Sequence, residues 1–193
     1  MNENSSKQVA EKWNEKFLND FRFQDVPVRK LVKQFSELLP RTGIALEIAG
    51  GTGATTDFLQ KHGLKVLEID IAYQALRKAV TRNNGASYIV ADARYFPLSL
   101  CAFDVICNFY FLERSVFSAI VELLKPGGIV LFETMTIDML RIRPEISPSH
   151  LLAAGELKQA FPSWKIIHYY EGWTDSEHGH TKSIAQLVAQ KPV

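Results

Sequence analysis

The sequence is poor in cysteine, contains no long hydrophobic run and carries almost no net charge. Its two cysteines, Cys101 and Cys107, are too few for a disulfide framework and lack the spacing of paired zinc ligands. The longest apolar runs, such as 129–132, end after a few residues, whereas a membrane-spanning helix needs about 20. The 22 basic and 21 acidic residues leave a formal charge of +1. These absences argue against a secreted disulfide-rich protein, a membrane partner and a nucleic-acid partner.

The N-terminal residues are polar and mixed in charge, without the apolar segment of a signal peptide. Together with the scarcity of cysteine, this predicts a reducing, cytoplasmic setting. The 193 residues exceed the roughly 150 residues of an average domain only modestly, so we expect a single domain over 1–193. Within it we interpret 1–41 as an N-terminal helical cap, 42–193 as the core and 134–148 as a lid or insertion.

Short apolar runs alternate with helical patterns from residue 44 onward, which indicates strands joined by helices. The runs that have the length of buried strands lie at 44–49, 64–69, 87–91, 103–108 and 129–133, and the helical patterns at 8–18, 28–39, 56–62, 72–80, 116–124 and 151–161. We expect a turn at 125–128 and a terminal antiparallel hairpin from 164–170 and 183–189. Because parallel strands require crossovers, the pattern predicts a doubly wound α/β fold with a mostly parallel, seven-stranded sheet.

A glycine-rich turn follows the first predicted strand. In such sheets, ligands bind at the carboxyl ends of the strands, and Gly51 and Gly53 allow a sharp turn that a ligand can approach closely. Asp70 follows Gly51 by 19 residues, near the expected spacing of about 20 for a ribose-binding acid. Thr56 stands where a pyrophosphate-binding fingerprint has its third glycine, so an adenosine ligand without phosphates fits better. The alternative, a tight turn with no ligand, stays open.

Asp92 comes directly after the third predicted strand, where its carboxylate could accept a hydrogen bond from an adenine amino group. A carboxylate that caps the loop is the alternative for this residue. With Glu47 and Asp70, Asp92 completes a series of acids at three successive strand ends, which favours a nucleoside site over three unrelated surface carboxylates.

These residues resemble the motifs of class I S-adenosylmethionine-dependent methyltransferases, which have a Rossmann-like fold. The similar segments are Leu46-Glu47-Ile48-Ala49-Gly50-Gly51-Thr52-Gly53, Asp70, Asp92-Ala93, Phe103-Asp104-Val105-Ile106 and Leu124-Lys125-Pro126-Gly127-Gly128. A narrower resemblance, to the tellurite-resistance-type branch, lies in Tyr110-Phe111-Leu112-Glu113-Arg114 and Phe132-Glu133-Thr134. Ala49 departs from the family, since many of its members have glycine there. The resemblance implies S-adenosylmethionine as cofactor, held by Glu47, Ala49, Gly50, Gly51, Gly53, Asp70, Ile71, Asp92, Ala93, Asn108 and Phe109.

The segment after the fourth predicted strand is the candidate acceptor site. Tyr110 is the stronger candidate for an acceptor contact because it carries a hydroxyl, and Asn108, Arg114 and Glu133 are further candidates. Core packing is the alternative for Phe109, and also for Trp13 and Phe17, which could instead cover the cofactor. We expect no metal site, and we interpret His178-Gly179-His180 as a solvated hairpin tip rather than a chelating pair.

The sequence therefore predicts methyl transfer from S-adenosylmethionine to a small-molecule acceptor. One alternative is a nicotinamide-dependent oxidoreductase, which Thr56 and the lack of an evident Tyr-x-x-x-Lys arrangement disfavour. A second alternative is a noncatalytic cofactor-binding or scaffolding protein. The sequence carries no signal for an oligomeric state.

Overall fold

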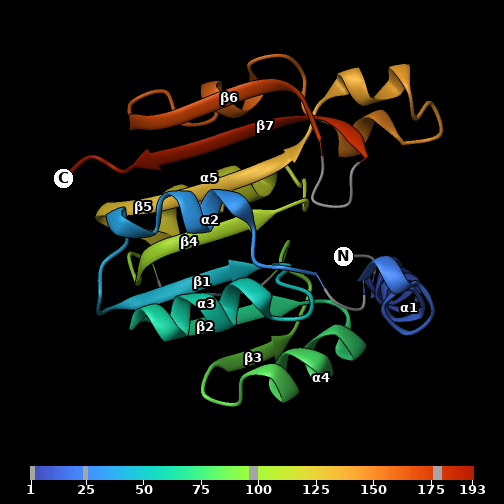
Figure 1. Ribbon diagram of the computed structural model, residues 1–193, viewed down its shortest axis with the longest axis horizontal. Coiled ribbons are helices and arrows are strands. Elements are labelled where there is room, and N and C mark those ends of the chain that lie inside the picture. The colour runs from blue at the N-terminus through green and yellow to red at the C-terminus, as the bar shows by residue number, and fades with distance from the viewer. Residues whose placement is uncertain (1–2, 24–25, 96–99, 176–179) are drawn as a thin grey trace. The chain divides into compact units, whose positions relative to one another are not determined.

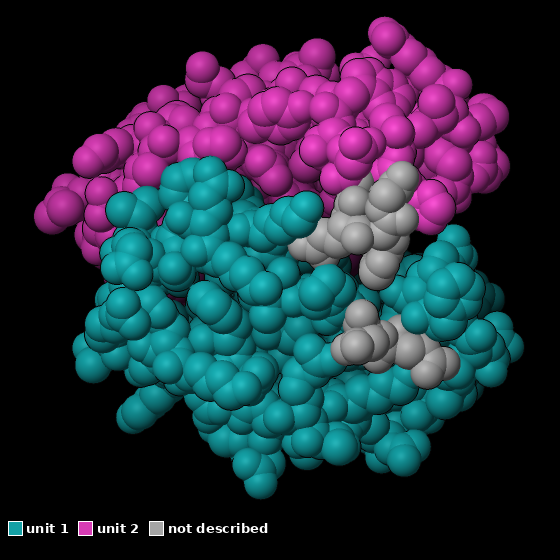
Figure 2. Space-filling view, viewed as in Figure 1, with its two compact units in different colours: residues 1–98 teal, residues 99–193 magenta. Residues whose placement is uncertain are grey.

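The computed structural model describes residues 3–23, 26–95, 100–175 and 180–193 of the chain (Figure 1). The chain divides into two compact units, Met1–Leu98 and Ser99–Val193 (Figure 2). A single domain over 1–193 stays a prediction. Across the described residues, no helix is both long and apolar enough to cross a membrane.

The first unit is built on three parallel strands in the order β3-β2-β1. The strands are β1 (Ile44–Ile48), β2 (Lys65–Asp70) and β3 (Ser87–Val90), and the helical segments are α1 (Glu3–Asn19), η1 (Phe21–Phe23), α2 (Lys30–Gln34), η2 (Ser36–Leu38), α3 (Ala54–His62) and α4 (Tyr73–Arg82). Helices α3 and α4 make the two crossovers that parallel pairing requires. Fully buried Leu46 and nearly buried Ile69 show that these strands supply the core of the unit.

The second unit holds four strands in the order β4-β5-β7-β6. Its elements are β4 (Phe103–Phe109), α5 (Ser115–Leu123), β5 (Leu124–Met135), η3 (Ile137–Arg141), η4 (Pro148–His150), α6 (Glu156–Gln159), β6 (Lys165–Asp175) and β7 (Thr181–Gln190). Strand β5 pairs with β4 in parallel and with β7 antiparallel, and β6 and β7 form the long antiparallel hairpin (Figure 1). Phe132 and Ile106 are fully buried here.

The seven strands have the order β3-β2-β1-β4-β5-β7-β6. The predicted mostly parallel, seven-stranded α/β fold with a C-terminal antiparallel hairpin is confirmed. Each predicted strand overlaps an observed one, because runs of buried apolar residues of strand length are the most reliable signal in this sequence.

Two predicted helices are shorter than their apolar spacing indicates. The helix expected at 28–39 is α2 followed by the 3-10 segment η2. Near their junction, the Ser36 hydroxyl donates to the Lys33 carbonyl oxygen at 2.9 Å, which competes with regular backbone pairing. The helix expected at 151–161 is α6 alone. Leu152 instead forms a strand-like bridge with Thr136, and Gly155 adopts a left-handed conformation at φ 70° just before the helix.

The turn expected at 125–128 lies inside β5 rather than before it. Phe103 pairs with Leu124 and Val105 with Ile129, so two steps along β4 face five along β5 and the extra residues bulge out of the ladder. The Lys125 ammonium lies 2.8 Å from the Asp104 carboxylate across this bulge. Tertiary pairing with β4 therefore begins β5 earlier than the Lys-Pro-Gly-Gly sequence indicates.

Gly63, which ends α3, offers a test of the close packing in the first unit. It has φ 118°, and a Cβ added there would lie 2.2 Å from the Arg41 carbonyl oxygen. We expect Gly63→Ala to lower the free energy of unfolding by at least about 2 kcal/mol, measured by urea denaturation. Gly127→Ala is the matched control, because Gly127 is also left-handed at φ 77° but its Cβ would come no closer than 3.8 Å to its nearest neighbour. Equal losses in the two variants would contradict the steric explanation.

Candidate functional site

The glycine-rich turn between β1 and α3 is strongly bent. Three of its residues have left-handed backbones, Ala49 at φ 54°, Gly51 at φ 69° and Gly53 at φ 73°. Glycine adopts this conformation readily, whereas a residue with a side chain is strained by about 1–3 kcal/mol. Ala49, where many members of the resembling family have glycine, therefore keeps a glycine-like conformation in spite of its methyl group.

The turn also lies directly on the side chains beneath it. A Cβ added to Gly50 would be 2.6 Å from the Glu68 carboxyl carbon, and one added to Gly53 would be 2.7 Å from the Ala79 methyl group. At Gly51 the corresponding Cβ would lie 3.4 Å from the ring of Phe17, an ordinary contact distance. Packing therefore requires glycine at positions 50 and 53, whereas backbone conformation favours it at 51.

A pair of buried glutamates supports this turn. Glu47 and Glu68 are partners in the β1–β2 register, and their exposed fractions are 3% and 0%. The Thr56 hydroxyl donates to Glu47 Oε2 at 2.5 Å, while the Glu68 oxygens have no hydrogen-bond partner among the described residues. Burial raises the pKa of Glu47 to about 7, and burial together with the charge of Glu47 raises the pKa of Glu68 to about 9. Sequence reasoning missed Glu68, although an acid within an apolar strand was a detectable signal.

Asp70, at the end of β2, links the turn to the next helix. Its Oδ2 accepts the Gly51 N–H at 2.9 Å and its Oδ1 accepts the Ala72 N–H at 2.8 Å. Burial raises the pKa of Asp70 to about 6, and these backbone donors oppose the shift. Each carboxylate oxygen retains a lone pair, so Asp70 can still accept from the two hydroxyls of a ribose.

Asp92, after β3, is held by two residues that sequence reasoning missed. The Arg94 guanidinium donates to both carboxylate oxygens, and the Ser6 hydroxyl in α1 donates to Oδ2 at 2.7 Å. The hydrogen bonds from Arg94 lower the pKa of Asp92 to about 2. Asp92 is thus an ionised carboxylate that ties α1 to the strand end, and its adenine contact stays a prediction.

Helix α1 is anchored beside the turn at further points. Phe17 is 7% exposed and packs against Ala72 and Ala75, with Trp13 and Phe23 around it. The Gln74 N–H donates to Asn14 Oδ1 at 2.8 Å. Phe17 is therefore a core residue of the first unit that also lies beside Gly51.

In the second unit, the residues at the end of β4 have unusual environments. Asn108 is fully buried, and neither its amide oxygen nor its amide nitrogen has a hydrogen-bond partner among the described residues. Phe109 is 6% exposed, and Tyr110 directly after it has φ 60°. A buried amide without partners costs about 1–3 kcal/mol, which makes Asn108 a candidate for a ligand contact.

The structure brings the candidates Tyr110 and Glu133 together, and their contact with an acceptor stays a prediction. The Tyr110 hydroxyl donates to Glu133, and two residues of β7, Lys182 and Gln186, also bind this pair. Lys182 and Gln186 were missed because they lie about 50 residues from Glu133 in the chain, with no local motif. Arg114 instead donates to Glu156 and to the carbonyl oxygens of Ser149 and Leu151. It thereby anchors the segment after the predicted lid, and an acceptor contact from it stays a prediction.

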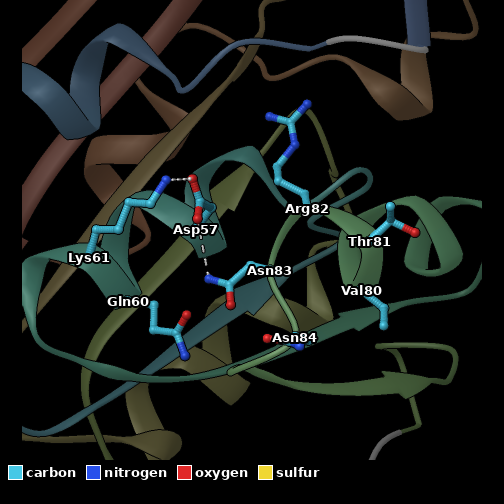
Figure 3. Close-up of a pocket in the computed structure, with 8 residues that line it drawn as sticks. All are labelled: Asp57, Gln60, Lys61, Val80, Thr81, Arg82, Asn83 and Asn84. Carbon is cyan, nitrogen blue, oxygen red and sulfur yellow. Dashed lines mark hydrogen bonds and ion pairs between the residues drawn. The ribbon is translucent and has the colours of Figure 1, made fainter.

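A shallow pocket of about 600 Å³ lies between α3 and the end of α4 (Figure 3). Its lining residues are Asp57, Gln60, Lys61, Val80, Thr81, Arg82, Asn83 and Asn84. They include none of the predicted cofactor or acceptor residues, and an Asp57–Lys61 ion pair of 2.7 Å crosses part of its rim. This pocket is therefore separate from the candidate site.

Possible metal and thiol chemistry has little support in the described part of the chain. No group of three or more His, Cys, Asp and Glu residues there could hold a metal ion. Cys101 is exposed and Cys107 buried, and the two do not form a disulfide. The predicted tip at 178–180 lies outside the described residues except for His180.

The buried Glu68 makes stability depend on pH. Its folded-state pKa of about 9 exceeds the usual 4.5, so its contribution to stability is complete below about pH 4.5 and is lost as the pH rises through 9. We expect the free energy of unfolding to fall from pH 7 to pH 9, and Glu68→Gln to exceed the wild type at pH 9 by about 1–3 kcal/mol. Denaturant unfolding at several pH values measures this. Glu37→Gln, whose side chain is 89% exposed, is the control, and parallel curves for Glu68→Gln and the wild type would contradict the prediction.

Comparisons with known proteins show which domain part of this chain resembles. Residues 45–128 match the family model described as a methyltransferase domain. A curated relative, malonyl-acyl-carrier protein O-methyltransferase of Hamiltonella defensa subsp. Acyrthosiphon pisum, is 25% identical over 101 residues. The match covers 50% of this chain and 39% of the relative, so the chain spans well under half the length of that protein.

Solved structures agree with this match at the level of the fold. The N-methyltransferase NodS from Bradyrhizobium japonicum, solved in complex with S-adenosylhomocysteine, has a TM-score of 0.69 at 20% identity, covering 97% of this chain and 99% of NodS. TehB from Haemophilus influenzae has a TM-score of 0.69 at 19% identity, covering 92% of this chain and 66% of TehB. Residues 45–128 are therefore similar to a methyltransferase domain, and the chain shares its fold with solved methyltransferase structures.

Proposed function

We propose that this protein transfers a methyl group from S-adenosylmethionine to a small-molecule acceptor. The observation that carries the proposal is the arrangement around Gly51, where a left-handed glycine turn is hydrogen-bonded to the buried carboxylate of Asp70. An adenosine ligand needs both features, a backbone that it can approach closely and an acid that accepts from ribose hydroxyls.

The donor set of the first unit fits this cofactor. Asp70 would hold the ribose, Asp92 and Ala93 the adenine, and the turn the methionine part. Thr52, in the middle of the turn, has a buried hydroxyl with no hydrogen-bond partner among the described residues. In full, the residues proposed to hold the cofactor are Glu47, Ala49, Gly50, Gly51, Gly53, Asp70, Ile71, Asp92, Ala93, Asn108 and Phe109.

The chain's own residues contribute chiefly orientation and exclusion of water. When bound, S-adenosylmethionine supplies an activated methyl group on a sulfonium sulfur. Asp70 and the turn would hold the cofactor, and the residues after β4 would orient the methyl acceptor. Holding two reactants in line can lower the barrier by about 7–11 kcal/mol, so no metal or covalent intermediate is required of the protein.

A small acceptor is supported by the charge of the chain. Its formal net charge is +1, so electrostatic attraction to a polyanion is weak. The buried polar groups at the end of β4, Asn108 and the Tyr110–Glu133 pair, suit recognition of a few polar atoms of a small molecule.

The role of Asp70 is tested by cofactor binding. We expect Asp70→Ala to weaken binding of S-adenosylhomocysteine at least about tenfold, equivalent to about 1.4 kcal/mol, without unfolding the chain. Calorimetry measures the affinity, and circular dichroism verifies folding. Asp57→Ala, which removes a carboxylate from α3 outside the proposed site, should bind as the wild type does. An unchanged dissociation constant for Asp70→Ala would remove Asp70 from the site.

The acceptor class is tested by product release. We expect formation of S-adenosylhomocysteine from S-adenosylmethionine with members of a small-molecule panel of hydroxyl, thiol and amine compounds, and none with nucleic acids or intact proteins. Thermal shifts with S-adenosylhomocysteine and with NAD distinguish the oxidoreductase alternative. Binding of the cofactor without turnover of any acceptor would instead support the noncatalytic alternative.

A further inference from the structure

Three strands of the second unit bring polar residues to one place. Tyr110 directly follows β4, and Glu133 of β5 is the register partner of Phe109 at the end of β4. Gln186 of β7 is in turn the register partner of Glu133, and Lys182 lies four residues earlier on the same strand. We name Tyr110, Glu133, Lys182 and Gln186 the tyrosine cluster. It lies at the carboxyl ends of two parallel strands, the edge at which α/β sheets bind ligands.

The hydrogen bonds of the tyrosine cluster have a definite direction. Lys182 has only protons to donate, and it donates to the Tyr110 hydroxyl oxygen, so the Tyr110 proton points to Glu133 Oε1. Gln186 Nε2 donates to Glu133 Oε2 at 2.6 Å, and Lys182 Nζ lies 3.4 Å from Glu133 Oε1. Glu133 thus accepts from every partner in the cluster, which is the role of an ionised carboxylate.

Burial and backbone conformation distinguish the members of the cluster. The side chain of Glu133 is 7% exposed and that of Lys182 is 20% exposed, while Tyr110 is partly exposed. Tyr110 also has φ 60°, which is rare for an aromatic residue. Its N–H donates to the Glu133 carbonyl oxygen at 2.8 Å, which helps to hold this conformation. Strained residues of this kind concentrate at functional sites.

We propose that Tyr110 is a catalytic residue that removes the proton of a weakly acidic hydroxyl acceptor and passes its own proton to Glu133. This inference rests on the proposed methyl transfer and deepens it by naming the acceptor chemistry. Lys182 is a positioning residue, because its ammonium stabilises negative charge on the Tyr110 oxygen. Gln186 orients the Glu133 carboxylate.

The proton transfer balances without a further reactant. The acceptor oxygen forms its bond to the methyl carbon as its O–H bond breaks, and its proton moves to the Tyr110 oxygen. The Tyr110 proton moves to Glu133 Oε1, which becomes a carboxylic acid. The electron pair of the broken carbon–sulfur bond stays on sulfur, so the positive charge lost there reappears as the proton on Glu133.

The positive charge of Lys182 distinguishes neutral hydroxyl acceptors from cationic amine acceptors. Its Nζ lies 4.7 Å from the centre of the Tyr110 ring, so a cationic amine next to the Tyr110 hydroxyl would meet like charge. An acceptor oxygen that becomes negative in the transition state is stabilised there instead. We therefore assign the site to phenols and enols rather than to ammonium groups.

The test compares substituted phenols that are protonated at the assay pH with phenols that are already ionised. We expect Tyr110→Phe to lower kcat about 10²–10⁴-fold for the protonated phenols and to affect the ionised ones far less. In this variant the rate should follow the ionised fraction of the phenol, rising about tenfold per pH unit. Lys182→Met should have the same signature, and Lys182→Arg should restore part of the rate because it retains the positive charge.

Tyr169→Phe is the matched control. The Tyr169 hydroxyl also donates to a carboxylate of the second unit, Glu171, but lies outside the tyrosine cluster, so its rates should equal those of the wild type. Thermal unfolding of each variant separates loss of structure from loss of proton transfer. An equal loss for protonated and ionised phenols in a folded Tyr110→Phe variant would overturn the proposed proton transfer.

Failure of this inference is distinguishable from failure of the proposed function. Turnover of thiols or amines, without turnover of any phenol or enol, would overturn the acceptor assignment while leaving methyl transfer intact. If no acceptor of any kind is turned over, NMR titration of phenols into the complex with S-adenosylhomocysteine decides. Phenol binding that Tyr110→Phe weakens would support the site, and lack of binding would overturn it.

Discussion

The contact between the first glycine-rich turn and the Glu68 carboxyl group is the constraint on which the first unit depends. Gly50 can lie on this carboxyl group because it has no Cβ, and Gly53 can lie against Ala79 for the same reason. That close approach holds the turn against Glu68 of β2. Asp70 lies two residues further along the same strand, where its carboxylate accepts the Gly51 N–H. The position of the candidate cofactor site is therefore set by the packing of the turn against side chains of β2 and α4.

This arrangement buries two acidic side chains, and their ionisation inside the protein is unfavourable. Glu47 and Glu68 lie side by side in the β1–β2 ladder, and burial raises the pKa of both. A protonated Glu68 avoids the larger cost of a buried charge, so at neutral pH the folded turn holds a proton that the unfolded chain has already released. The stability of the folded turn therefore depends on whether Glu68 is protonated.

In the second unit, the antiparallel hairpin brings polar side chains to the end of β4. Pairing of β7 with β5 places Lys182 and Gln186 beside Glu133, at the edge where β4 ends. The hairpin therefore supplies half of the tyrosine cluster as well as covering an edge of the parallel strands. In the resulting network Lys182 donates to Tyr110, and Tyr110 and Gln186 donate to Glu133.

The sequence by itself determined the strand–helix alternation, the glycine-rich turn and the acids at the strand ends, because these depend on periodicity and on residues close together in the chain. It indicated Tyr110 and Glu133 through local motifs. It did not indicate Ser6 beside Asp92, Glu68 beneath the turn, or Lys182 beside Tyr110. It also overextended the helix at 151–161, since the bridge between Leu152 and Thr136 competes with helical pairing. Tertiary structure alone decided these contacts, because strand register and helix packing join residues that no local pattern relates.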